Sequence, residues 1–144
     1  MDKLDKNKRS WNMSRIKSKN TKPELLVKKY LYAKGVRYKS SKRKLIGNPD
    51  LVIKKYKLAL FVHGCFWHAH KNCKHFRYPK SNIDFWKNKI DGNRKRDEKV
   101  LNELSRLSFL IFTIWECEVK NYNFRTLDKF IEKYFELRTK SSIQ

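Results

Sequence analysis

The alternation of apolar and polar positions predicts helices and strands that succeed one another along the chain. Three stretches have helical spacing of their apolar residues, and three are short, nearly continuous apolar runs typical of strands. The predicted helices are 21–35, 83–107 and 125–138, and the predicted strands are 50–53, 58–63 and 109–115. This order indicates one α/β domain whose mixed sheet is flanked by helices.

Local chemistry refines these elements. Thr21 and Glu24 have the spacing of a capping box, with Pro23 in the first turn of the helix that follows. The run 58–63 has the unbroken apolar character of a central strand buried on both faces, and 109–115 is predicted as another buried strand. The tripeptide 91–93, Asp-Gly-Asn, is expected to perturb the long helix midway.

The length and the net charge of the chain limit the class of protein it can be. A chain of 144 residues is normally one domain, which we place at 21–144, behind a basic arm at 1–20. Lys and Arg number 36 against 14 Asp and Glu, a formal charge of +22. Such an excess favours nucleic acid as the partner, because phosphate contacts release counterions. Charge alone fits a ribosomal protein equally well.

The cysteines suggest a metal. The sequence contains no apolar run of membrane-spanning length and no signal-peptide core, so we expect a cytoplasmic, reducing setting. Three cysteines in that setting argue for a metal site rather than for disulfides. Cys65, His70, Cys73 and Cys117 would fill a tetrahedral, structural Zn²⁺ site. His68 and His75 remain competing fourth ligands.

A second group of residues suggests catalysis. Asp50 stands at the start of a predicted strand, where a carboxylate can hold a hard cation against a phosphate. His63 and His68 flank Cys65, and imidazole can accept or donate a proton at neutral pH. Each of these residues is weak evidence taken singly, and the capping box alone explains Glu24.

The dipeptide Phe66-Trp67 lies between a predicted zinc ligand and His68. An aromatic pair on a loop fixed in this way can wedge between base pairs and unstack them. The alternative is ordinary core packing, since both residue types are common in cores.

Taken together, these motifs closely resemble the very-short-patch-repair endonucleases. The resemblance runs from about Ser10 to the last helix. It rests on His63-Gly64-Cys65-Phe66-Trp67-His68-Ala69-His70, then Cys73, Phe85-Trp86, Lys89, Asn93, Arg96-Asp97 and Trp115-Glu116-Cys117. It implies a restriction-endonuclease-like fold with a structural zinc. It also implies an enzyme that nicks DNA 5′ to the thymine of a T:G mismatch left by deamination of 5-methylcytosine.

The resemblance further implies a role for individual residues. Asp50 matches the main Mg²⁺ ligand, helped by the backbone carbonyl of Val62, and Glu24 matches a carboxylate that orients water at the metal. His63 and His68 match the catalytic histidines. The other matched residues are the zinc ligands Cys65, His70, Cys73 and Cys117, the intercalating residues Met13, Phe66 and Trp67, and the mismatch-reading residues Lys89 and Asn93.

The expected partners follow from this function. They are double-stranded DNA with a T:G mismatch and, through the repair pathway, a C5-cytosine methyltransferase, a polymerase and a ligase. We expect a monomer, because a single asymmetric nick needs one copy. Two alternatives remain at this stage: a zinc-stabilised nucleic-acid-binding protein without catalysis, and a nuclease of the same fold without mismatch specificity.

Overall fold

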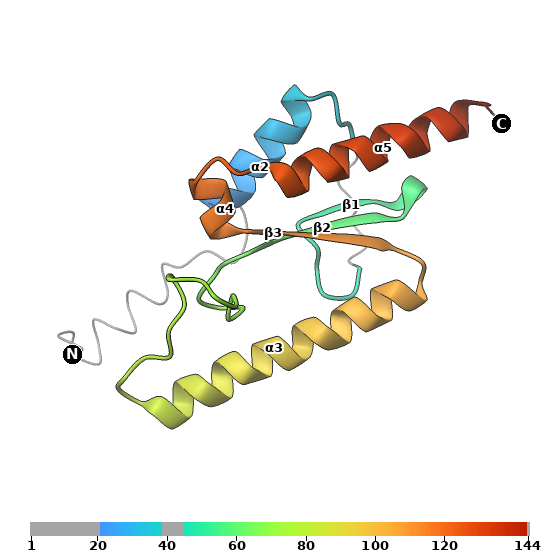
Figure 1. The fold of residues 1–144 in the computed structure, drawn as a ribbon. Helices are drawn as coiled ribbons and strands as arrows, with labels where there is room; N and C mark the ends of the chain where they lie inside the picture. Colours follow the sequence, from blue (N-terminus) through green and yellow to red (C-terminus); the bar gives the residue numbers. More distant parts are fainter. Residues whose placement is uncertain (1–20, 39–44, 144) are drawn as a thin grey trace.

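The computed structural model describes residues 21–38 and 45–143 (Figure 1). The predicted basic arm, with Met13, lies outside the described residues. The elements are α2 (Lys22–Ala33), β1 (Leu51–Ile53), the 3₁₀ helix η1 (Lys54–Tyr56), β2 (Leu58–His63), α3 (Ile83–Arg106), β3 (Leu110–Trp115), α4 (Glu116–Lys120) and α5 (Arg125–Ile143). The predicted α/β class, with a mixed sheet flanked by helices, is confirmed.

The described strands form one sheet in the order β1-β2-β3. β1 runs antiparallel to β2, and β3 runs parallel to it, with His63 opposite Trp115. β2 is the central strand, as predicted, and its first four residues are buried. The prediction that 109–115 is a buried strand is wrong for most of β3, where only Ile114 is buried. β3 pairs on one side alone in the described sheet, so much of it stays partly exposed.

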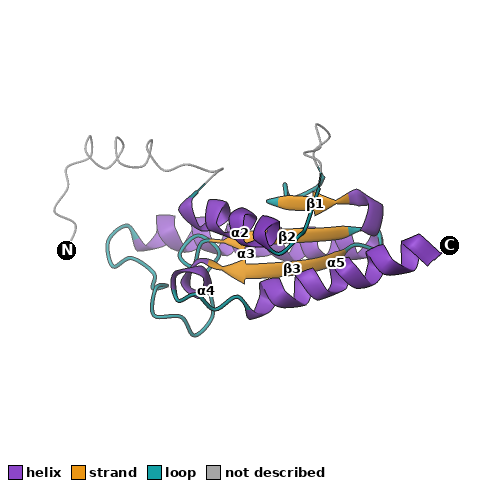
Figure 2. Ribbon diagram, turned by 90° about the horizontal axis from the view of Figure 1, so that it is seen from above, coloured by secondary structure: helices purple, strands orange, loops and turns teal. Residues whose placement is uncertain are grey.

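Helices cover both faces of the sheet (Figures 1 and 2). α2, α4 and α5 lie on one face, and α3 lies on the other. Because side chains alternate along a strand, Leu58 and Leu60 of β2 join the core under α2 and α5, whereas Phe61 and His63 point toward the α3 side. The α3 face therefore carries the chemistry at the end of β2.

Helix α2 begins where its sequence predicts. Thr21 caps it, with its hydroxyl oxygen accepting a hydrogen bond from the Glu24 N–H at 3.4 Å, and Pro23 lies in the first turn. Val27 and Leu31 bury the helix against the sheet. The cap fixes the first turn in space, and this turn carries the Glu24 carboxylate.

Helix α3 runs without interruption from Ile83 to Arg106, so the expected perturbation at 91–93 is wrong. A glycine in a helix costs about 1 kcal/mol relative to alanine. That cost is small beside the stabilisation of a helix of 24 residues anchored by Ile90 and Leu104, which are fully buried. Asp91 and Asn93 flank the glycine without ending the helix.

Gly47 and Gly92 make a matched pair for a stability test. Gly47 has φ +79°, and a Cβ there would lie 2.3 Å from a methyl carbon of Val100, whereas a Cβ on Gly92 would meet nothing within 4 Å. We expect Gly47→Ala to lower the free energy of unfolding by roughly 1–3 kcal/mol, because the substitution adds both backbone strain and a clash. Gly92→Ala should raise it by about 0.5–1 kcal/mol. Thermal melts of both variants check this pair, and equal shifts would contradict the described packing of residue 47 on α3.

Two features were not predicted, and the first of them bears on the site. The short helix α4 starts at Glu116, directly after β3, and so brings Cys117 back toward the sheet edge. η1 joins β1 to β2 through Lys57, whose φ of +52° closes the tight connection.

Among the described helices, none combines the length and apolar character needed to cross a membrane.

Candidate active site

Strand direction brings the predicted catalytic residues to one edge of the sheet. β2 and β3 are parallel, so His63 and Trp115 end their strands side by side. β1 is antiparallel to β2, so its start, next to Asp50, lies at the same edge. Open α/β sheets bind ligands at the carboxyl ends of their parallel strands, and Asp50 joins the carboxyl ends of β2 and β3 here because β1 runs the other way.

A cleft of about 380 Å³ opens at this edge. The predicted catalytic and magnesium-binding residues all line it. Its walls are Thr21, Pro23, Glu24, Asp50, Val62, His63, Gly64, Trp67, His68 and Glu116. Residues from α2, from the start of β1, from the end of β2 and from the following loop therefore converge on one space.

Asp50 is held rigidly in the cleft. The backbone N–H of Val62 donates a hydrogen bond to its Oδ2 at 2.6 Å. Burial raises the pKa of Asp50 to about 6, and the Glu24 carboxylate adds to the rise, while the Val62 hydrogen bond opposes it. A nearby cation would favour the charged form, so this carboxylate suits a cation site.

Glu24 supplies a second carboxylate to the cleft. It is only 5% exposed, and Lys28 lies 3.0 Å from its Oε1. Two partly buried carboxylates with one ammonium group leave an excess of negative charge, and carboxylate oxygens are the ligands that Mg²⁺ prefers. The donor set of this cleft therefore fits a magnesium ion.

The two histidines stack face to face. Their ring centroids are 3.8 Å apart and their planes differ by 3°. His68 also places its Nδ1 2.6 Å from Oδ2 of Asp97 on α3, and it groups with His63 and Asp97 rather than with the cysteines. Burial and, to a smaller extent, the neighbouring His68 lower the pKa of His63 to about 4, against the opposing effect of Asp97, so His63 is neutral near pH 7.

Asp97 is one of the residues that resemble the family, but the resemblance assigned it no role. Lys89, Asn93 and Asp97 follow one another at intervals of four residues, which places them on one face of α3. This spacing predicts that Asp97 faces the same site as the other two. Glu116, likewise quoted without a role, lines the cleft and pairs with Lys120 at 3.1 Å.

The predicted zinc ligands gather into one cluster. The side-chain donor atoms of Cys65, His70, Cys73 and Cys117 all lie within 4.8 Å of one another. The Nδ1 of His70 is 3.5 Å from the Cys117 sulfur, and the Cys117 N–H donates to the Cys65 sulfur at 3.4 Å. His75 is exposed and does not belong to this cluster. The structure therefore favours His70 as the fourth ligand.

The chemistry of the cluster fits a structural zinc ion. Three sulfurs and one imidazole nitrogen complete a tetrahedral Zn²⁺ site and leave no open position. Burial raises the pKa of Cys65 to about 12, so a bound cation is needed to make this sulfur a thiolate at neutral pH. Such a cation would join the loop after β2 to helix α4.

Phe66 and Trp67 lie in a cluster of aromatic rings. The Phe66 ring contacts Trp67, Phe76 and Trp86 at centroid distances of 5.1, 6.3 and 5.5 Å. Trp67 also borders the cleft. Both residues are half-buried, so the pair takes part in packing and is also partly open to solvent.

The groove-reading residues predicted on α3 differ in their surroundings. Lys89 is exposed. The Asn93 side-chain amide donates a hydrogen bond to the Trp67 carbonyl at 3.0 Å. Asn93 thus ties α3 to the loop that carries the aromatic pair.

Fold and cleft define a class, an α/β protein with a carboxylate and histidine site suited to cleavage of phosphodiesters. Comparison with known proteins identifies the family. Residues 1–75 match the family model described as DNA mismatch endonuclease Vsr. The chain is 48% identical over 114 residues to a protein of Neisseria meningitidis named type II nicking enzyme V.NmeAIP, covering 79% of this chain and 81% of that one.

Two other relatives agree. The type II nicking enzyme V.HpaIIP of Haemophilus parainfluenzae is 46% identical over 121 residues, covering 83% of this chain and 85% of its own. DNA mismatch endonuclease Vsr of Escherichia coli is 34% identical over 119 residues, covering 83% of this chain and 76% of its own. The chain belongs to the Vsr family of DNA-nicking endonucleases.

Proposed function

We propose that this member of the family nicks one strand of duplex DNA at a T:G mismatch, 5′ to the thymine, in a Mg²⁺-dependent reaction. The observation that carries the proposal is the convergence of Asp50, Glu24, His63, His68 and Trp67 on one cleft. A binding protein without catalysis gives no reason for this convergence. The name of the relative from Escherichia coli supports the choice of a mismatch as substrate.

In this proposal the cleft binds both cation and phosphate. Asp50 and the Val62 carbonyl would hold Mg²⁺, and Glu24 would orient a water molecule beside the ion. When bound, this ion neutralises charge on the scissile phosphate and on the leaving 3′ oxygen. The basic surface of the protein, at +22 overall, draws the DNA backbone toward the cleft.

The two histidines are assigned to proton transfer. His68, oriented by Asp97 at 2.6 Å, accepts a proton from the attacking water. His63 stacks on His68 and faces the phosphate. Water attacks phosphorus as His68 takes its proton, the bond to the 3′ oxygen breaks, and that oxygen takes a proton from solvent water. The products are a 5′-phosphate and a 3′-hydroxyl, and His68 then returns its proton to solvent.

Mismatch recognition belongs to the aromatic loop and α3. Phe66 and Trp67 enter the base stack, together with Met13 of the basic arm. Lys89 and Asn93 read the mismatched pair in the groove. The support for these roles is that the Trp67 indole borders the cleft and that the hydrogen bond from Asn93 holds the backbone of Trp67.

Trp67→Ala tests the wedge. We expect the dissociation constant for T:G duplex to rise roughly 10-fold to 100-fold, because base–aromatic stacking contributes about 1–3 kcal/mol. Paired duplex should lose much less, since its bases need not unstack. Tyr122→Ala, at an aromatic residue that is 78% exposed, serves as the control. Equal losses on both duplexes would show that Trp67 only packs.

The proposed partners extend this function. Residues 1–20 contact DNA and residues 21–144 form the endonuclease domain, acting as a monomer. We place its action inside the cell, where the cysteines stay reduced and the nick is passed to a polymerase and a ligase. Its substrate arises at sites of a C5-cytosine methyltransferase.

A second candidate is a nicking enzyme that recognises a sequence without a mismatch. The names of two relatives, both type II nicking enzymes, favour it. A panel of labelled duplexes that place T:G, or the matched C:G pair, in different flanking sequences separates the two, with and without Mg²⁺. Nicking only of T:G duplexes supports the proposal, and nicking of C:G duplexes at equal rates would replace it with the second candidate.

A further inference from the structure

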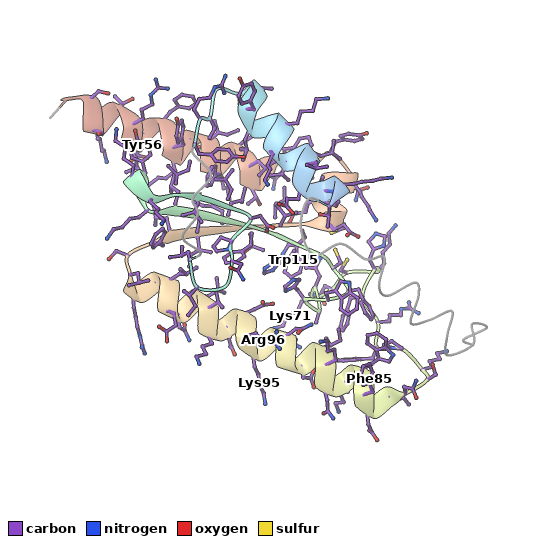
Figure 3. All side chains as sticks on the ribbon, turned by 180° about the vertical axis from the view of Figure 1, so that it is seen from behind. Tyr56, Lys71, Phe85, Lys95, Arg96 and Trp115 are labelled. Atoms are coloured by element: carbon purple, nitrogen blue, oxygen red, sulfur yellow. The ribbon has the colours of Figure 1, made fainter. Side chains whose placement is uncertain are left out.

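Trp115 lies between the two functional clusters of the protein. Its ring stacks on His70, a residue of the cysteine cluster, with centroids 4.0 Å apart and planes 7° apart. It also meets the ring of His63 nearly edge-on, at 5.3 Å and 74°. Figure 3 shows Trp115 between the sheet and α3. One indole ring thus contacts both a zinc ligand and a histidine of the cleft.

The strand register explains this position. Trp115 is the partner of His63 in the parallel pairing of β3 with β2, so both side chains point to the α3 face. His70 stacks on the indole from the loop after β2, where its backbone N–H donates to the Cys65 carbonyl at 3.0 Å. Three different segments therefore build a continuous row of rings: His68, His63, Trp115 and His70.

The histidine pair borders two cavities. His63 and His68 line the catalytic cleft, and they also line a second cavity of about 790 Å³ between the sheet and α3. Among the described residues, the aromatic rings that contact His63 are those of Phe61, His68 and Trp115. Of these three, only Trp115 is itself stacked on a residue of the cysteine cluster.

We propose that Trp115 is a positioning residue, which fixes the stacked histidine pair at the cleft and joins it mechanically to the zinc site through His70. This inference rests on the proposed function, because the rings it positions are those assigned to proton transfer. It gives the zinc site a role beyond stability. The zinc-bound loop and β3 together set the angle at which His63 and His68 face the phosphate.

Two substitutions at Trp115 and one control separate positioning from stability. Trp115→Leu removes the aromatic face, and Trp115→Phe keeps one. Phe112→Leu makes the same kind of change on the opposite face of β3, where Phe112 packs against Phe130 at 5.3 Å. Each full-length variant is assayed for kcat, for KM, for duplex affinity, for bound zinc and for thermal stability.

We expect Trp115→Leu to lower kcat roughly 10-fold to 100-fold, because small misplacements of reacting groups have costs of this size. Affinity for the duplex should change little, because recognition in the proposed function rests on the aromatic loop, on α3 and on the basic surface. Trp115→Phe should restore most of kcat, and Phe112→Leu should lower thermal stability without lowering kcat. An unchanged kcat in Trp115→Leu, or an equal loss in Phe112→Leu, would overturn the proposal.

Nuclear magnetic resonance gives a measurement that needs neither nicking nor a folded variant. In the zinc-loaded wild-type protein, the imidazole protons of His63 should show cross-relaxation with the indole protons of Trp115. Absence of these cross-peaks would overturn the proposed contact even if the enzyme is fully active. If the wild type nicks no duplex but the cross-peaks are present, the proposed function fails while the contact between Trp115 and His63 stands.

Discussion

Asp50→Asn should reduce nicking by roughly a thousandfold or more while leaving DNA binding intact, because loss of a cation ligand raises the barrier by several kcal/mol. The choice of asparagine matters. Its side-chain oxygen can still accept the hydrogen bond that the Val62 N–H makes at 2.6 Å, so the end of β2 keeps its partner. Alanine would leave that donor unsatisfied and would confuse a catalytic loss with a structural one.

The measurement pairs single-turnover nicking of a T:G duplex with a binding assay on the same duplex. Asp128→Asn is a matched control, because Asp128 is an exposed carboxylate on α5 whose partner is the hydroxyl of Tyr30. The control should nick at the wild-type rate. Full nicking by Asp50→Asn, or loss of binding in parallel with nicking, would remove Asp50 from the cation site.

The second large effect concerns the zinc cluster. His70→Ala should weaken zinc affinity by roughly 100-fold or more, since even groups that only orient metal ligands contribute tenfold to a hundredfold. Loss of zinc should lower the melting temperature and abolish nicking, because the ion joins the loop after β2 to α4. Zinc content by mass spectrometry and thermal melts measure both quantities.

His75→Ala provides the comparison for His70. His75 is an exposed histidine two residues after Cys73, and it was a competing ligand on sequence grounds. His75 contributes no donor atom to the cluster, so this variant should keep its zinc and its melting temperature. The reverse pattern, with zinc lost from His75→Ala and kept by His70→Ala, would mean that the loop folds differently.

Local patterns predicted the elements of the fold better than their burial. The unbroken apolar run at 58–63 gave β2 its true bounds and its central place. A similar run at 109–115 suggested equal burial for β3, which is instead the outer strand. Strand order depends on long-range pairing, and an apolar run does not carry that information. Likewise Gly92 suggested a break that the buried anchors of α3 prevent.

The types of residue and their spacing predicted those parts of the candidate site whose members lie close together in the sequence. The predicted zinc ligands lie close together in sequence apart from Cys117, and the structure gathers all of them into one cluster. Asp97 received no role, because its meeting with His68 joins a helix to a distant loop. The row of rings through Trp115 could not be predicted from the sequence either, since it depends on the register of two strands and on the turn before His70.

Nicking at a mismatch by the cleft around Asp50 is measured by one ratio of nicking rates. Single-turnover rates are measured with Mg²⁺ on two duplexes that differ only in one pair, T:G or C:G, with each strand labelled separately. We expect a single nick in the thymine strand, 5′ to the mismatched thymine, and little or no nicking of the C:G duplex. Equal rates on both duplexes, or nicks in either strand, would contradict it.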